Sequence, residues 1–143
     1  MEPTPEALFH PYATRLDGFA HRHNLLVEKY RHDVAMWSFF FQHPLGGSGR
    51  IILQINKSKE VFLQKNWTLY LYDKSLRRSR DTNPERIDKP DDRLEAVVLA
   101  AIKDILGWEL ASLTDTAQVS MPAGVDPVKY PKVIFRESGK NSR

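Results

Sequence analysis

Apolar and polar residues alternate along the middle of the chain, which is the pattern of β-strands with one buried face. In the stretch MWSFFFQH, alternation places Trp37, Phe39 and Phe41 on one side of a strand and turns Phe40 to the other side. The stretch PLGGSG follows at once and supplies glycines that tolerate positive φ, which a tight reversal needs. The pattern predicts a hairpin whose first strand buries three of its aromatic residues, while Phe40 points away from the core.

Residues 24–31, 50–56 and 60–73 show the same alternation and predict further strands. The last of these ranges is apolar at odd positions and polar at even positions, where two tyrosines lie. One long strand would explain this pattern, and so would two strands that join at Lys65 and Asn66. We therefore expect three or four antiparallel strands in total.

Helical spacing appears on both sides of these strands. Over residues 91–110 the apolar side chains recur at steps of three and four, and acidic residues occupy the first turn, where the helix dipole favours them. Gly107 is the expected stop. A shorter helix is predicted after His10 with Pro11 at its first position, because proline fits the first turn of a helix but breaks its interior.

The resulting order predicts an α+β domain, in which the antiparallel sheet packs its apolar face against an N-terminal and a longer C-terminal helix. Residues 1–10 are expected to form a flexible N-terminus, and residues 11–113 a single domain. Residues 114–143 contain several prolines and many basic side chains, so we expect an irregular, partly disordered C-terminal segment.

Composition removes several classes of function. The 143-residue chain has no cysteine, which excludes disulfides, thiolate nucleophiles and cysteine-based metal sites. No apolar run is long enough for a membrane span, and the N-terminus lacks the pattern of a signal peptide, so we expect a cytoplasmic protein without membrane contact.

Catalytic and metal-binding patterns are also missing. His21 and His23 are two residues apart and diverge on a helix, and no metal-binding spacing supports them. The GGSG stretch lacks the lysine of a phosphate-binding loop, and no nucleophile elbow occurs. We therefore predict no cofactor, no metal and no catalytic residue. A small enzyme or ligand carrier remains the third hypothesis, which predicts a polar cavity near His23 or His43.

Charge is unevenly distributed along the chain. Residues 91–110 carry five acidic and two basic side chains, whereas residues 74–80 carry four basic side chains and no acid. Residues 129–143 add five basic side chains and one acid. Basic charge thus falls in a predicted linker and a tail instead of a folded face, which disfavours a nucleic-acid binder.

The outer face of the sheet is the predicted interaction surface, because tyrosine and arginine are enriched where partners dock. Its predicted members come from three strands and the basic linker: Phe40, Gln54, Tyr70, Tyr72, Arg77, Arg78 and Arg80. The preferred hypothesis is a non-catalytic protein-binding or adaptor module, which docks a protein partner or a second copy of itself through this face or a sheet edge. The alternative is a nucleic-acid-binding domain, in which the tyrosines stack on bases and the linker and tail contact phosphates.

The order helix–strands–helix resembles that of the double-stranded-RNA-binding domain. The second helix of that family typically opens with lysines, whereas the stretch KPDDRLEA places acids there in this chain. The dimeric secretion chaperones share a similar order but tend to be acidic, unlike this protein. Neither resemblance extends to individual residues, so no site residue is carried over from either family.

Overall fold

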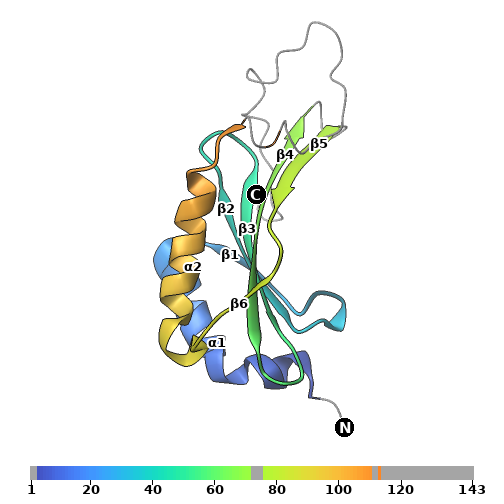
Figure 1. Cartoon of the computed structure of the whole chain (residues 1–143), viewed down its shortest axis with the longest axis vertical. Coiled ribbons are helices and arrows are strands. Elements are labelled where there is room, and N and C mark those ends of the chain that lie inside the picture. The colour runs from blue at the N-terminus through green and yellow to red at the C-terminus, as the bar shows by residue number, and fades with distance from the viewer. Residues whose placement is uncertain (1–2, 72–75, 111–112, 114–143) are drawn as a thin grey trace, which may run out of the picture.

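Two helices lie on one face of an antiparallel sheet, as Figure 1 shows. The computed structural model describes residues 3–71, 76–110 and 113. The helical elements are α1 (Pro5–His23), the short 3-10 turn η1 (Arg31–Asp33) and α2 (Pro90–Leu106). The strands are β1 (Leu26–Lys29), β2 (Met36–Gln42), β3 (Ser48–Ile55), β4 (Val61–Leu71), β5 (Leu76–Asp81) and β6 (Glu85–Arg86).

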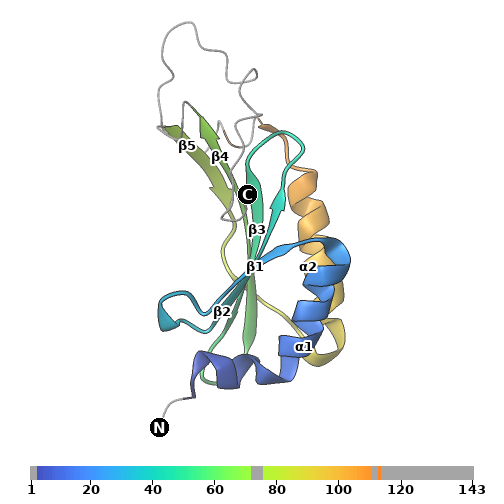
Figure 2. The ribbon, with the colours of Figure 1, turned by 180° about the vertical axis from the view of Figure 1, so that it is seen from behind.

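The sheet follows the order of the chain. Strands β1 to β5 are neighbours in sequence order, every pair is antiparallel, and the short β6 pairs with the start of β4. Figure 2 shows the same sheet from behind, with the β1–β2 turn and the β4–β5 pair extending from opposite ends of the face that α1 and α2 leave uncovered. The predicted α+β class and element order are confirmed, although the sheet has more strands than the three or four expected.

The predicted strand alternation is confirmed in β2 and β3. Trp37 and Phe39 are fully buried, whereas Phe40 is half-buried and lies on the other face. Phe41 is also only half-buried, although it packs against the core. The α1 helix covers this part of the sheet, with the Phe9 ring 5.6 Å from that of Trp37 and the Phe19 ring 5.6 Å from that of Phe39.

The open question about residues 60–73 is resolved for the described part: β4 is one strand of eleven residues. Its pairing with β3 continues without interruption through Lys65 and Asn66. By contrast, the prediction of a basic linker at residues 74–80 was wrong, because β5 begins at Leu76 and pairs with β4 over its whole length. An arginine-rich stretch shows no apolar alternation, so its sequence does not indicate a strand.

The first helix begins earlier than predicted. Thr4 accepts a hydrogen bond from the amide of Ala7 through its side chain at 3.1 Å and so caps the helix, and Pro5 is its first residue. Pro11 therefore lies inside α1, and residues 5–10 are helical where a flexible segment was expected. With 19 residues against 17, α1 is also the longer of the two helices, contrary to the prediction. The predicted stop at Gly107 is confirmed as the C-cap of α2.

Two polar contacts join α1 to α2. The Tyr12 hydroxyl donates to Asp91 at 3.0 Å, and the Arg15 guanidinium donates to both carboxylate oxygens of Glu95, at 3.0 and 2.5 Å. These bonds lower the pKa of Glu95, because Arg15 stabilises its charged form. The two helices are thus fixed to each other as well as to the sheet.

The β2–β3 loop packs back against the core. The Trp67 indole donates to the carbonyl of Gly46 at 2.8 Å, and the buried imidazole of His43 stacks on the Trp67 ring with 3.6 Å between centroids. The Nε2 atom of His43 lies 2.8 Å from the carbonyl of Ile105, and Nδ1 accepts from the amide of Leu45 at 3.1 Å. Because Nδ1 accepts, the neutral ring with hydrogen on Nε2 fits this site.

This arrangement predicts a pH dependence of stability. Burial lowers the pKa of His43 below its usual value of about 6.5, despite the opposing bond to the Ile105 carbonyl. As pH falls, His43 therefore binds a proton in the unfolded chain at a higher pH than in the folded protein. The free energy of unfolding then falls as pH drops below about 6.5, by at most about 1.4 kcal/mol per pH unit. Urea unfolding at pH 7.5 and 5.5 measures this loss. We expect it to be smaller in His43→Gln, and an equal loss in both proteins would contradict the assignment.

Candidate functional site

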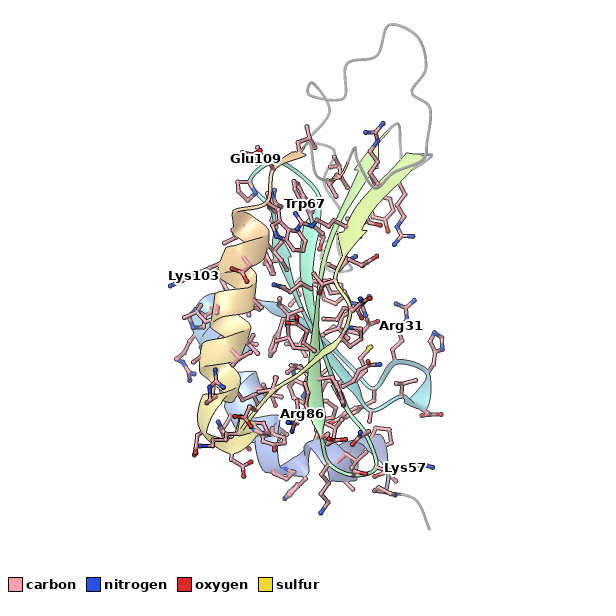
Figure 3. All side chains as sticks on the ribbon, in the orientation of Figure 1. Arg31, Lys57, Trp67, Arg86, Lys103 and Glu109 are labelled. Carbon is pink, nitrogen blue, oxygen red and sulfur yellow. The ribbon has the colours of Figure 1, made fainter. Side chains whose placement is uncertain are left out.

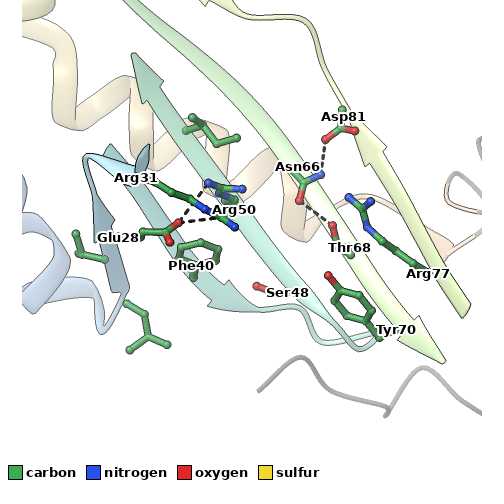
Figure 4. Close-up of a pocket in the computed structure, with 13 residues that line it drawn as sticks. Glu28, Arg31, Phe40, Ser48, Arg50, Asn66, Thr68, Tyr70, Arg77 and Asp81 are labelled. Atoms are coloured by element: carbon green, nitrogen blue, oxygen red, sulfur yellow. Dashed lines mark hydrogen bonds and ion pairs between the residues drawn. The ribbon is translucent and has the colours of Figure 1, made fainter. Parts of the chain in front are cut away.

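A groove of about 910 Å³ crosses the sheet face that lies opposite the helices, and Figure 4 shows its lining. All five strands from β1 to β5 contribute side chains to it. Figure 3 places Trp67 between the sheet and α2, whereas Arg31 lies on the far side of the sheet. The groove is thus separated from the hydrophobic core by the sheet itself.

The apolar part of the lining comes from the outward-facing positions of β1 to β4. These side chains are Leu26, Phe40, Ile52 and Tyr70, whereas Val27, which pairs with Phe39, borders the groove but packs against the core. Leu26 is 49% exposed, which is high for a large apolar residue. Apolar area of this kind gains free energy when a partner covers it, at about 25 cal/mol per Å².

Arg50 is the most constrained charged group in the groove. Its guanidinium donates to the Ser38 hydroxyl from Nε at 3.2 Å and from Nη2 at 3.0 Å, and lies over the Phe40 ring, 5.1 Å from its centroid. Burial lowers the pKa of Arg50, and the carboxylate of Glu28, 3.5 Å from Nη2, opposes this effect. Contacts on several sides hold this guanidinium in one orientation.

A hydrogen-bonded chain of polar side chains crosses from β4 to β5. The Asn66 amide donates to Asp81, and the Thr68 hydroxyl donates to the Asn66 carbonyl oxygen at 2.9 Å. Asn66 and Thr68 are both buried, at 8% exposure. These hydrogen bonds link Thr68, Asn66 and Asp81, so they hold the three side chains on this wall of the groove in fixed positions.

The opposite end of the groove has a strained backbone. Arg31 lies between Tyr30 and His32, whose φ angles are 56° and 55°, and Asp33 follows with φ of 60°. Residues with a side chain avoid this region, and such strain is concentrated at functional sites. Here it turns the chain sharply between β1 and β2, where Arg31 lines the groove.

Three of the predicted interaction residues line the groove, namely Phe40, Tyr70 and Arg77. Gln54 lies farther along β3, where it pairs with Met36 and Phe62, and does not line the groove. Tyr72 is outside the described residues, as is the C-terminal segment 114–143.

Two predicted residues lie on the wrong face for this groove. Arg78 pairs with Leu69 in the sheet and is only 5% exposed, so it points to the helix side. Arg80 pairs with Trp67, and its guanidinium lies 4.1 Å from the centroid of the Trp108 ring. The prediction treated residues 74–80 as a linker, whose side chains would not be divided between two faces. In the strand β5, neighbouring side chains point to opposite faces of the sheet instead.

Several groove residues were missed: Glu28, Arg31, Arg50, Asn66 and Asp81. For Arg50 a signal was present, because the alternation that buries Ile51 turns Arg50 and Ile52 to the outer face. Of the remaining charged residues, Glu28 belongs to β1, Arg31 to the turn between β1 and β2, and Asp81 to β5. The positions of this turn and of β5 depend on the folded sheet.

Metal binding, membrane spanning and a polar cavity near His23 or His43 were also considered from the sequence. No cluster of three or more metal-binding side chains occurs among the described residues, and no helix in that part of the chain is long and apolar enough to cross a membrane. Neither His23 nor His43 lines the groove. No protein-family model, curated protein or solved structure matches this chain, so its site is interpreted from its own geometry.

Proposed function

We propose that this protein is a non-catalytic binding or adaptor module that holds a protein partner in the outer-face groove. The observation that carries the proposal is the combination of a partly exposed apolar floor with three arginines, Arg31, Arg50 and Arg77, on the sheet face opposite the helices. Aromatic and arginine side chains supply much of the binding energy in protein interfaces. The cytoplasmic location stays a prediction from the sequence.

The chemistry of the lining favours binding over catalysis. Its two carboxylates already have partners, since Glu28 lies near Arg50 and Asp81 accepts from Asn66. Among the described residues, the lining includes no histidine, lysine or cysteine. A general acid or base needs a side chain that exchanges a proton near neutral pH, and arginine does not.

The same lining favours a protein over a nucleic acid. A nucleic-acid strand carries a negative charge at every nucleotide, so its backbone could not follow the groove without placing phosphates beside Glu28 and Asp81, whereas a peptide can have carboxylates only opposite the arginines. The basic cluster expected to contact phosphates is divided, because Arg77 faces the groove while Arg78 and Arg80 face the helices. This division weakens the nucleic-acid alternative, which relied on these arginines together with the sheet tyrosines and the tail.

Selection from a displayed library of random peptides tests the proposal. We expect the full chain to enrich peptides that Phe40→Ala/Tyr70→Ala binds at least tenfold more weakly, because the two rings provide much of the apolar contact in the groove. Fluorescence anisotropy measures the affinities, and circular dichroism confirms that each variant is folded.

Leu106→Ala is the matched control, because it removes an exposed apolar side chain from α2, outside the groove. Its affinity for the enriched peptides should equal that of the unmodified protein. A selection that enriches no peptide, or peptides that bind the groove variant equally well, would refute the proposal.

A further inference from the structure

We infer that the groove binds an acidic, extended segment of the partner, with a carboxylate on Arg77 and neighbouring apolar side chains on the floor. This inference rests on the proposed function and specifies the chemistry of the partner. Three features of the groove support it: its unbalanced charge, its preset guanidinium and its length.

The groove has more positive than negative charge available to a ligand. Glu28 is the shared counter-ion of Arg31, at 3.9 Å, and of Arg50, at 3.5 Å, so one carboxylate serves two guanidinium groups at long distances. No ion pair joins Arg77 to any residue in the described part of the chain. A ligand with carboxylates would complete the pairing that the protein leaves unfinished.

Arg50 is ready to bind before a ligand arrives. Ser38 and the Phe40 ring hold its guanidinium, and its side chain is only 21% exposed. Most of its hydration has therefore been lost on folding, and little side-chain entropy remains to be lost on binding. Its Nε and Nη2 groups donate to Ser38 and Glu28, whereas Nη1 donates to no described residue and can donate to a ligand carboxylate.

The length of the groove indicates a peptide segment instead of a small anion. Its lining runs from Glu28 and Arg31 near β1 to Arg77 and Asp81 on β5 (Figure 4). Neighbouring strands are about 4.8 Å apart, so four intervals cover at most roughly 19 Å. An extended segment of about six residues has this length, whereas a single phosphate or carboxylate reaches only one end.

Residues 129–143 of the protein itself are poor occupants by charge. Residues 129–143 contain five basic side chains and one acidic side chain. These would face the groove arginines with charge of the same sign. An acidic segment from another protein fits the groove better.

Fluorescence anisotropy with three synthetic heptapeptides tests the inference. The first probe alternates three glutamates with leucine and phenylalanine, and its two counterparts carry glutamine or lysine in place of glutamate. We expect the glutamate probe to bind at least tenfold more tightly than the glutamine probe, with an affinity that falls as sodium chloride is raised.

Variants of Arg77 locate the charge effect. Arg77→Gln should weaken binding of the glutamate probe about tenfold, and Arg77→Glu should weaken it further while favouring the lysine probe. Arg86→Gln is the matched control, because Arg86 is exposed and does not line the groove. It should bind the glutamate probe like the unmodified protein.

The outcomes separate this inference from the proposed function. If selected peptides bind through Phe40 and Tyr70 but glutamate gives no advantage over glutamine, the acidic partner is wrong and the binding module stands. If neither the probes nor any selected peptide binds, both are wrong. If a single-stranded oligonucleotide displaces the glutamate probe at lower concentration than the unlabelled probe does, the groove serves nucleic acid and the inference is overturned.

Discussion

Replacing Phe39 with alanine should lower the free energy of unfolding by about 3–5 kcal/mol, the usual cost of removing a buried aromatic ring. Phe39 is fully buried, and its ring lies 5.6 Å from that of Phe19 and 6.4 Å from that of Trp37. Close packing on several sides limits how far the surrounding structure can collapse into the cavity.

Phe40→Ala is the matched control, since it changes the same residue type at the next position of the same strand. Phe40 is half-buried in the groove, so its replacement should cost only about 1 kcal/mol. Urea unfolding at constant pH measures both changes, provided that the slope with denaturant stays the same. Equal losses in the two variants would contradict the assignment of faces in β2.

Replacing Gly47 with alanine should cost about 2–5 kcal/mol, from an unfavourable backbone angle and a steric clash together. Gly47 has a φ of 74°, which side-chain-bearing residues avoid. A Cβ atom there would lie 2.2 Å from the carbonyl oxygen of Thr68 and 2.9 Å from the Cα of Leu69. Both atoms belong to the β4 backbone, which cannot move without disturbing its pairing.

The matched control is Gly18→Ala, inside α1. Its Cβ would meet only the end of the flexible Arg22 side chain, at 3.2 Å. Alanine favours a helix over glycine by about 1 kcal/mol, so this variant should be more stable than the unmodified protein. Thermal or urea unfolding distinguishes the opposite signs. If Gly47→Ala were as stable as the unmodified protein, the β2–β3 loop could not pack against β4 as described.

The elements that could be predicted are those whose sequence repeats with a clear period. Strand β2 and helix α2 each have such a pattern, and both were found where expected. The start of α1 was missed because Pro11 was assigned to the first turn, although Thr4 and Pro5 already provide the cap and first residue. Strand β5 was missed because its stability comes from pairing with β4, which depends on the folded sheet instead of local pattern.

The candidate site could be predicted only in part, for a related reason. Alternation correctly turned Phe40 and Tyr70 to the outer face, since each belongs to a recognised strand. Arg77 was included in a group with Arg78 and Arg80, yet only Arg77 lines the groove. Assigning arginines to faces requires the register of β5, and Arg31 reaches the groove through a turn whose backbone angles no residue pattern indicated.

The bonds between the two helices also bear on the order in which the chain folds. Arg15 and Glu95 are 80 residues apart in sequence, and at 5–20 residues per second a ribosome needs roughly 4 to 16 seconds to add that length. Helix α1 has earlier partners, because Phe9 and Phe19 pack against aromatic rings of β2. During synthesis we therefore expect α1 to pack on the first strands before the later strands have been made. The ion pair between Arg15 and Glu95 should form last.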